Sequence, residues 1–476
     1  MNAVNPRRWQ ALIVLAAAQF MVIMDTSIIG VALPDMQRDL GFSQGDLQWV
    51  FNAYVIAFGG LLLLGGRLSD LLGARKVFTA GWVVLIAGSV VAAVASGPAI
   101  EITGRAVQGV GGALIAPAAM TLLMMLFGHD QRELGKAMAL YGAAAPAGGT
   151  AGVFLGGVIT EYLSWPWVFI VYIPIGLATL AAVPGLLPAT RGRRGSVDLL
   201  GAAAVTAGIA LAVFAIVRAP EQGVGATVAQ AAGAAALLVL FLAVQRTVRE
   251  PLMPLRIWRT PGLATANLAM ALLGAAWIPM WYFLNLYLQQ VLGYGAFPSG
   301  AALVPMTVAI MIFMIGITAR LLGRFGAKPL IVIGLLVLAA GVGGLSLVRP
   351  DGAFVSDVLP ASLVAAVGMS LAYIPAMMSA MSGARPEESG LASGIVNTTY
   401  QVGSALGLVV MTAIATSRGA AELGNLPRLT DGFQAAFVGA GAVAVLGAVL
   451  SLLLMRGRKA AAAQESGRTE PSSIGA

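Results

Sequence analysis

Fourteen apolar runs, each long enough to cross a lipid bilayer, fill most of this 476-residue sequence. A membrane-spanning helix needs ~20 predominantly apolar residues. Charged residues make up only 10% of the chain, whereas soluble domains contain ~25%. The sequence therefore predicts an all-α integral membrane protein with fourteen transmembrane helices. They cover residues 9–33, 47–66, 77–97, 101–127, 137–160, 166–187, 197–217, 224–245, 262–290, 299–319, 329–348, 357–380, 390–416 and 433–455.

The distribution of lysine and arginine predicts how the chain is oriented. With the N-terminus inside, 22 of the 28 basic residues fall in inside segments and 5 in outside segments. Cytoplasmic connections carry such an excess, so both termini are predicted to be cytoplasmic. The net charge of +8 is then an orientation signal, and no nucleic-acid partner is expected. The basic segments Arg191–Arg194 and Arg246–Arg259 are predicted to contact the headgroups of membrane lipids.

A weak internal repeat divides the chain into two halves. The loop Gly66–Lys76 follows the second span, and the similar loop Ala319–Lys328 follows the tenth. Their alignment places Asp70 opposite Gly323, so only the first loop keeps the carboxylate. Related halves are typical of transporters. We predict a six-helix bundle over 1–190, two inserted helices and a basic connection over 191–260, a second six-helix bundle over 261–456, and a disordered cytoplasmic tail over 457–476.

Asp25 is the one ionisable side chain in the first apolar run. A carboxylate inside a bilayer costs ~3 kcal/mol on insertion scales, so it is usually neutral, paired or water-facing. Each of these states makes Asp25 a candidate proton-binding residue. The alternative is a carboxylate that only hydrogen-bonds neighbouring helices. In the other long runs we identify no second acidic residue at comparable depth.

Arg105 is predicted to lie at a depth similar to that of Asp25, about one turn from the outer end of the fourth span. An ion pair would lower the cost of burying both charges, and protonation of Asp25 would release Arg105. Gln108 shares the helical face of Arg105 and could hydrogen-bond either partner. We predict that Asp25 carries the proton and that Arg105 tunes the pKa of Asp25. The alternative is a static ion pair that holds the first and fourth spans together.

Four motifs resemble the major facilitator superfamily and, within it, the fourteen-span drug:proton antiporter family. They are the loop Gly66–Lys76, the first-span segment Met24–Pro34, the fourth-span segment Arg105–Gly112, and the fifth-span segment Gly148–Gly157 with its glycines Gly148, Gly152, Gly156 and Gly157. Three positions depart from the usual family pattern: Val153 replaces proline, Pro166 replaces arginine, and Tyr172 replaces asparagine.

The resemblance implies the major facilitator fold and a proton-coupled secondary transporter in the bacterial inner membrane. It would export hydrophobic drugs or antibiotics by alternating access, as a monomer. The resemblance also assigns the first loop to a conformational switch: Asp70 would link the two halves and stabilise the outward-facing state, and the other motif residues there are Gly66, Gly73, Arg75 and Lys76.

The substrate cavity is expected between the halves. Aromatic rings and amides suit a bulky, apolar, cationic or polyketide-like ligand. The candidate lining residues are Trp49, Asn52, Tyr54, Trp277, Trp281, Asn285, Tyr373, Asn397, Tyr400 and Gln401. Packing contacts or an interfacial aromatic belt would account for the same rings equally well.

The sequence also excludes several kinds of chemistry. It contains no cysteine, one histidine in a short polar loop, and no Gly-x-x-x-x-Gly-Lys-Ser/Thr phosphate loop. We therefore predict no enzymatic activity, no metal and no cofactor, with the proton gradient as the energy source. Two alternatives stay open: a dedicated exporter of one endogenous metabolite or lipid, and a non-transporting lipid-binding or sensor membrane protein.

Overall fold

The computed structural model describes residues 7–42, 47, 49–190, 192, 198–218, 222–249, 251–253, 255–259, 262–381, 389–420, 422 and 424–455, and the regular elements among them are all helical. The predicted tail over 457–476 and most of the basic segment Arg191–Arg194 lie outside these residues.

The helices fall into three groups along the chain. The first half contains α1 (Arg8–Leu40), α2 (Trp49–Leu72), α3 (Ala74–Ala93), α4 (Pro98–Phe127), α5 (Gln131–Tyr162), α6 (Trp167–Ile170) and α7 (Tyr172–Leu186). The helices α8 (Leu199–Arg218) and α9 (Val224–Thr247) and the 3₁₀ turn η1 (Leu255–Arg259) follow. The second half contains α10 (Leu263–Leu286), η2 (Tyr287–Val291), α11 (Ala296–Ile312), η3 (Phe313–Thr318), α12 (Ala319–Phe325), α13 (Ala327–Leu345), η4 (Phe354–Val358), α14 (Leu359–Met381), α15 (Ser389–Ser417) and α16 (Leu426–Leu454).

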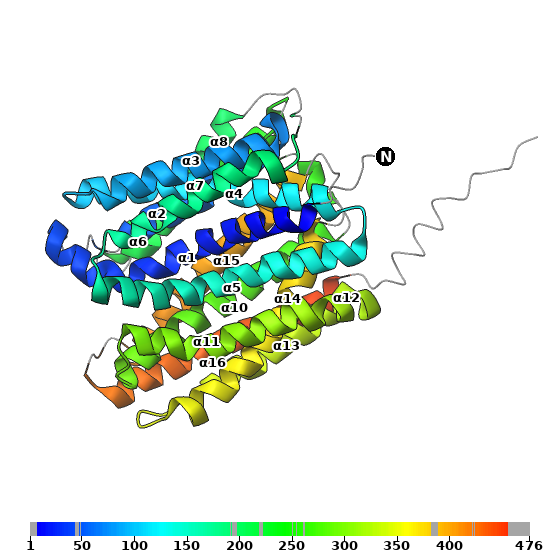
Figure 1. Cartoon of the computed structure of the whole chain (residues 1–476). Helices are drawn as coiled ribbons and strands as arrows, with labels where there is room; N and C mark the ends of the chain where they lie inside the picture. The colour runs from blue at the N-terminus through cyan, green and yellow to red at the C-terminus, as the bar shows by residue number, and fades with distance from the viewer. Residues whose placement is uncertain are drawn as a thin grey trace, which may run out of the picture.

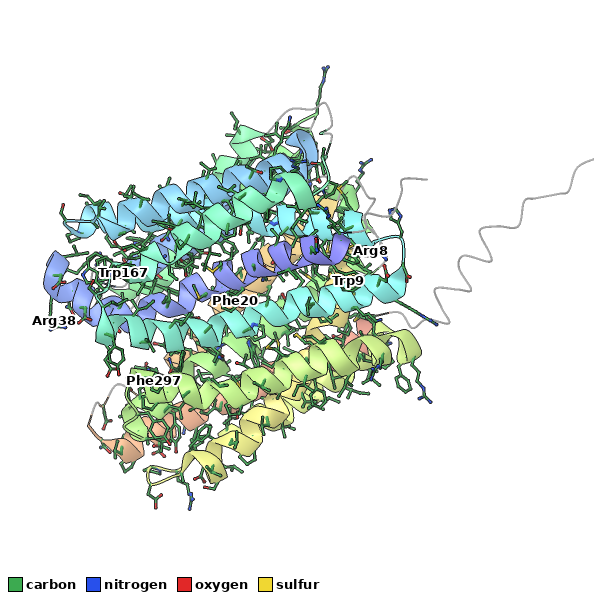
Figure 2. All side chains as sticks on the ribbon, in the orientation of Figure 1. Arg8, Trp9, Phe20, Arg38, Trp167 and Phe297 are labelled. Carbon is green, nitrogen blue, oxygen red and sulfur yellow. The ribbon has the colours of Figure 1, made fainter. Side chains whose placement is uncertain are left out.

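The predicted fold class is confirmed. In the described part of the chain, thirteen helical segments are long and apolar enough to cross a membrane. Helix α8 adds a fourteenth: it has 20 residues and is apolar over Leu199–Ala215. The long helices run side by side, with the first half above and α11, α13 and α16 below in Figure 1. Figure 2 shows Arg8 at one end of α1 and Arg38 near the other, which the basic-residue distribution makes the cytoplasmic and outer ends.

Small residues let the helices of each half pack closely. In the first half, a Cβ added to Gly152 of α5 would lie 2.8 Å from the backbone oxygen of Met24 in α1. In the second half, a Cβ added to Gly403 of α15 would overlap the backbone oxygen of Ala271 in α10. Glycine at such positions lets backbones approach where no hydrophobic force between helices acts. The helix pairs α1/α5 and α10/α15 therefore use the same packing solution.

The two repeated loops also match in backbone conformation. Gly73 precedes α3 with φ 95°, and Gly326 precedes α13 with φ 81°. Such positive φ angles strain any residue with a Cβ, which explains why glycine stands at both positions. The loop alignment made from the sequence thus pairs structurally equivalent residues.

The halves meet along α5 and α11 and along α2 and α15. On the outer side, the rings of Phe154 and Phe297 lie 4.9 Å apart, and Figure 2 shows Phe297 at the outer end of α11. Thr150 and Thr307 share a hydrogen bond between the same two helices. On the cytoplasmic side, a Cβ added to Gly394 of α15 would lie 3.0 Å from the Leu62 backbone oxygen. Val153, which replaces the motif proline, is buried.

Candidate coupling site and substrate region

A fully buried ion pair joins α1 to α4. Nη1 of Arg105 donates to Oδ2 of Asp25 at 2.6 Å, and both side chains have an exposed fraction of 0%. The two residues are 80 positions apart in the chain. The structure thus brings together the acid and the base that the sequence analysis placed at similar depths.

Other first-half groups also hold the Arg105 guanidinium. Its Nε donates to the backbone oxygen of Val50 at 2.9 Å, and Nη1 donates to Oε1 of Gln108 at 2.7 Å. The guanidinium carbon lies 4.8 Å from the ring centre of Tyr54 and 5.9 Å from that of Phe169. An arginine is stabilised by such aromatic faces. Arg105 therefore keeps several partners whatever the state of Asp25.

Gln108 connects the ion pair to α3. Its Nε2 donates to Oγ of Ser89 at 2.8 Å, and that hydroxyl donates to the Leu85 backbone oxygen at 2.9 Å. The helices are close here because α3 has Gly88 where a Cβ would lie 2.6 Å from the Gln108 nitrogen. The role expected for Gln108 thus has a geometric basis: it positions the guanidinium through a chain of hydrogen bonds.

The short helix α6 covers the ion pair on its outer side. Phe169 is fully buried against Arg105, and its ring centre lies 6.3 Å from that of Trp165. Nε1 of Trp165 donates to Oδ2 of Asp39, near the outer end of α1, at 2.9 Å. Trp167, at the start of α6, is exposed, and Figure 2 shows it towards the outer ends of the helices. These aromatic residues separate the buried charges from the outer surface.

Glu101 is a second buried acid in the first half, and it was not among the candidate site residues that the sequence analysis named. Its exposed fraction is 0%, and among the described residues neither carboxylate oxygen has a hydrogen-bond partner. The sequence analysis put Glu101 at the edge of the fourth run, where a residue can face water, whereas the neighbouring helices enclose it. The spacing to Arg105 was the signal: residues four apart lie on one helical face.

Several polar atoms around the pair also lack partners within the described part of the chain. They include Oδ1 of Asp25, Nη2 of Arg105 and the hydroxyl of Tyr172. Buried polar atoms are normally hydrogen-bonded, and exceptions often mark functional sites. Oδ1 is the Asp25 oxygen on which a proton could reside without displacing Arg105 first. Tyr172, at a position where the family usually has asparagine, interacts electrostatically with both charges.

Asp70 connects the two halves at their cytoplasmic ends. Its Oδ2 accepts a hydrogen bond of 3.2 Å from the backbone nitrogen of Leu391, in the first turn of α15. A helix N-terminus carries partial positive charge and favours such an anion. Within the same loop, Gly66 is buried, Lys76 is exposed, and the backbone nitrogen of Arg75 donates to Oγ1 of Thr190 at 3.0 Å.

Part of the predicted substrate-binding set lies where the halves meet. A Cβ added to Gly149 of α5 would lie 3.9 Å from Cζ2 of Trp281. A Cβ added to Gly142 would lie 3.6 Å from Cε1 of Tyr373, whose ring centre is 5.9 Å from that of Tyr400. These three aromatic residues of the second half therefore lie beside one another or beside α5.

The other residues of the predicted substrate-binding set differ in how far they are buried. Trp277 and Asn52 are buried, whereas Asn285, Asn397 and Gln401 are half-buried on α10 and α15.

Two predicted lining residues belong to other contacts. Trp49 packs on Phe214 of the inserted helix α8, with ring centres 5.6 Å apart. Tyr54 is fully buried under Arg105 and donates to the Val22 backbone oxygen at 3.1 Å. These contacts give both residues a packing role, and their place in the substrate-binding set stays a prediction, because the apolar run of the second span gave no information on which neighbour each face meets.

Residues 15–408 match the Major Facilitator Superfamily. The chain belongs to this family. A relative from Amycolatopsis lactamdurans, the cephamycin export protein CmcT, is 38% identical over 93% of this chain and 92% of its own length. The puromycin resistance protein pur8 of Streptomyces alboniger is 37% identical over 96% of this chain and 93% of its own length.

Solved structures show the same fold at low sequence identity. The human organic anion transporter MFSD10 has a TM-score of 0.68 at 16% identity, over 94% of this chain and all of its own. The proton:xylose symporter XylE has the same TM-score at 14% identity, over 95% of this chain and 97% of its own. The predictions of a multi-pass membrane transporter for small molecules and of a non-enzymatic protein are thereby confirmed.

Proposed function

We propose that this protein exports hydrophobic drugs or antibiotics in exchange for protons, with Asp25 as the proton-binding residue. The observation that carries the proposal is the fully buried ion pair between Asp25 and Arg105. Ionisable residues inside membranes are expensive to bury and are typically part of ion or substrate pathways. The printed names of the relatives, a cephamycin export protein and a puromycin resistance protein, support export of antibiotic-like compounds.

The geometry supports a simple coupling step. Protonation of Asp25 removes its negative charge, so the attraction across the 2.6 Å contact to Arg105 is lost. Arg105 keeps its bonds to Val50 and Gln108 and its contact with Tyr54, and therefore remains stabilised as a cation. Protonation thus releases α1 from α4 without leaving a bare charge in the membrane. A substrate that favours the deprotonated pair would compete with the proton.

Alternating access requires a contact that differs between the two states. The hydrogen bond from Leu391 to Asp70 is our candidate, because it ties α15 to the end of α2 on the cytoplasmic side. While this bond holds, the cytoplasmic ends of the halves stay together, so that only the outer side can open. Its rupture would let the cytoplasmic side open for substrate.

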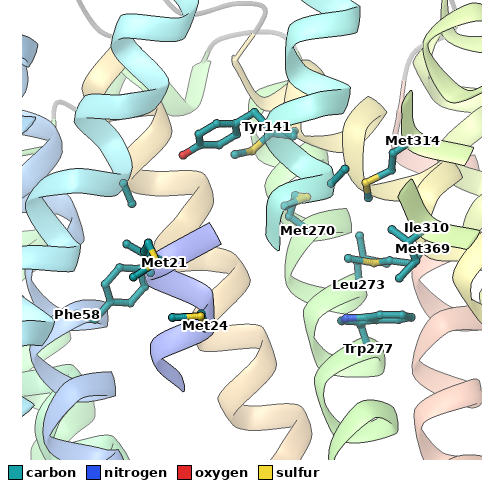
Figure 3. Close-up of a cluster of buried hydrophobic side chains, with 14 of the residues drawn as sticks. Met21, Met24, Phe58, Tyr141, Met270, Leu273, Trp277, Ile310, Met314 and Met369 are labelled. Carbon is teal, nitrogen blue, oxygen red and sulfur yellow. The ribbon is translucent and has the colours of Figure 1, made fainter. Parts of the chain in front are cut away.

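The centre of the molecule suits ligands of varied shape. Buried methionines lie on both sides of the interface between the halves: Figure 3 shows Met21 and Met24 on α1, and Met270, Met314 and Met369 on the second half, with Met369 beside Trp277. Methionine is flexible and polarisable, and it is common where a surface must accept different ligands. With Trp281, Tyr373 and Tyr400, these residues would form an apolar and adaptable substrate region.

A dedicated exporter of one compound is the second candidate. The names of several relatives each contain a single antibiotic, including cephamycin, puromycin and tetracenomycin C. This pattern favours a narrow substrate range, and the coupling residues would be the same in both cases.

A transport assay with purified protein separates the two. Proteoliposomes with an imposed pH gradient would be offered a panel of lipophilic cations, β-lactams, aminonucleosides and polyketides. Gradient-dependent accumulation of several classes supports the broad exporter, and accumulation of one class supports the dedicated exporter. Accumulation that ignores the pH gradient contradicts proton coupling.

A further inference from the structure

Glu101 has no role in the coupling step described above, although it is as buried as Asp25. It lies four residues before Arg105 in α4, so the two share one face and are ~6 Å apart along the helix axis. Its carboxylate interacts electrostatically with Arg105 and Asp25. Burying a carboxylate without hydrogen-bond partners is costly, so a purely structural origin is poorly supported.

A helix-capping role does not account for this residue. Glu101 lies in the first turn of α4, where an acidic side chain can bind free backbone N–H groups. Its own backbone nitrogen already donates to the Gly97 oxygen at 3.2 Å. Neither side-chain oxygen accepts a bond from any described residue. The carboxyl group is therefore enclosed beside the ion pair without serving the helix end.

We propose that Glu101 is a proton relay that takes up protons on the outer side and passes them to Asp25. This rests on the proposed proton-coupled function. The position of Glu101 gives the direction: α4 starts at the outer end of the membrane, so Glu101 is one turn closer to the outside than Arg105. In an exporter driven by protons, the outside is the side from which protons enter.

The transfer conserves charge within the buried cluster. At the start, Asp25 is a carboxylate paired with Arg105, and Glu101 carries the proton. The O–H bond of Glu101 breaks, and an O–H bond forms on Asp25, whose Oδ1 has no partner among the described residues. Arg105 then exchanges from Asp25 to the new Glu101 carboxylate, towards which its unbonded Nη2 can turn. One cation and one anion are present before and after, so no unpaired charge is buried.

The groups facing this cluster come from several helices. The charged ones are Arg105 on α4 and Asp25 on α1, and the neutral ones are the hydroxyls of Tyr54 on α2 and Tyr172 on α7 and, through Gln108, that of Ser89 on α3. Asp39, further out on α1, accepts from Trp165 above Phe169.

The test compares wild type, Glu101→Gln and Glu101→Asp in proteoliposomes, with transport rate measured as a function of outer pH. A positioned acid speeds proton transfer by ~10²–10⁴-fold, and other steps then limit turnover, so Glu101→Gln should slow transport at least ~10-fold near neutral outer pH. Direct protonation of Asp25 is first order in protons. The variant rate should therefore rise ~10-fold per unit of outer acidification, while the wild-type rate saturates. Glu101→Asp should restore part of the rate.

Controls separate the possible failures. Substrate affinity of Glu101→Gln in detergent should match wild type, and Glu161→Gln, an exposed acid at the outer end of α5, should leave transport unchanged. A uniform loss of rate at every outer pH, or a loss of substrate affinity, would make Glu101 structural and overturn the relay. If Asp25→Asn still couples protons to substrate, the proposed function itself fails. If Asp25→Asn uncouples but Glu101→Gln behaves as wild type, only the relay fails.

Discussion

Helix α1 in the first half corresponds to α10 in the second, and each packs against a glycine-bearing partner, α5 or α15. Yet α1 faces the buried charges with Asp25, whereas α10 carries Asn267 and the indoles Trp277 and Trp281. Among the described residues of the second half, the buried polar side chains are amides and hydroxyls, with no buried acid or base. The two halves therefore differ in what they bury: the first half contains the buried ion pair, and the second half contains neutral polar side chains and aromatic rings.

The paired loops differ in the same way. Gly73 and Gly326 give both loops one backbone shape, but only the first loop has a carboxylate, Asp70, that reaches the other half. Gly323 stands at the matching position of the second loop. Both loops thus have the same backbone shape, while the carboxylate contact to the other half is made by the first loop.

The second half contains the irregular helix segments. Among the described residues, the π-helical turns η2, η3 and η4 all lie there, in three different spans. Such turns are rare and are frequent at functional sites, because they rotate the following side chains relative to a regular helix. The half without buried charge is therefore the one whose helices are locally reshaped.

The largest expected effect comes from removing the buried cation. Arg105→Ala leaves Asp25 unpaired in the membrane, which should lower the free energy of unfolding by ~3–5 kcal/mol and abolish coupling. Asn267→Ala is the matched change in the second half, because Asn267 is also buried, and among the described residues its side chain bonds only the Leu263 backbone oxygen of its own helix. Asn267→Ala should lower the free energy of unfolding by at most ~1 kcal/mol. Equal losses in detergent unfolding would contradict the proposed asymmetry.

The next effect concerns the glycine contacts. Gly152→Ala pushes α5 away from the helix that carries Asp25, and overpacking of this kind costs ~1–3 kcal/mol. Gly403→Ala does the same to α10 and α15. Both variants should be destabilised, but only Gly152→Ala should change the ratio of protons to substrate. Gly30→Ala on α1, where a Cβ meets no atom within 4 Å, serves as the control.

The substrate surface of the second half is tested by tryptophan truncation. Trp281→Ala removes an indole beside α5, and loss of such an anchor should weaken substrate binding ~10-fold. Trp49→Ala removes an indole that packs on the inserted helix, and affinity should stay unchanged. Tryptophan-quenching or calorimetric titration measures both. The reverse result would place the substrate beside α2 and α8.

The smallest effect is a shift in conformational population. Asp70→Asn weakens a charge-assisted bond at a helix N-terminus by ~1 kcal/mol. The population of the cytoplasm-open state relative to the closed state should therefore rise ~5-fold. The chain has no cysteine, so spin labels can be attached specifically at Leu72→Cys and Phe325→Cys, at the exposed ends of α2 and α12. The distance between the two labels reports how far apart the cytoplasmic ends of the halves lie. Gly323→Ala in the paired loop should leave the distance distribution unchanged.

The sequence predicted most of the fold for simple physical reasons. Hydropathy fixes which segments span the membrane, and the count of lysine and arginine fixes their direction, so the fourteen spans could be recognised. The Asp25–Arg105 contact was also foreseeable, because two opposite charges at one depth in a bilayer have a strong reason to meet. Glu101 was missed because its burial comes from the packing of other helices and not from its own apolar run.

The contacts of aromatic residues were the least predictable feature. A tryptophan in an apolar helix looks the same in sequence whether it faces a substrate path or another helix. Trp49 and Tyr54 were assigned to the cavity, yet one packs on α8 and the other on Arg105. Helical spacing tells which residues share a face, and only the tertiary fold tells what that face meets.

The most direct test of the account is substrate-evoked proton movement in proteoliposomes that contain an internal pH dye. Wild type would be compared with Asp25→Asn and with Asp35→Asn, a control on the same helix whose acid pairs with the exposed Arg38. The account predicts that substrate addition moves protons in wild type and Asp35→Asn, and that Asp25→Asn moves none. Normal proton movement by Asp25→Asn would show that the buried pair is structural and contradict the central claim.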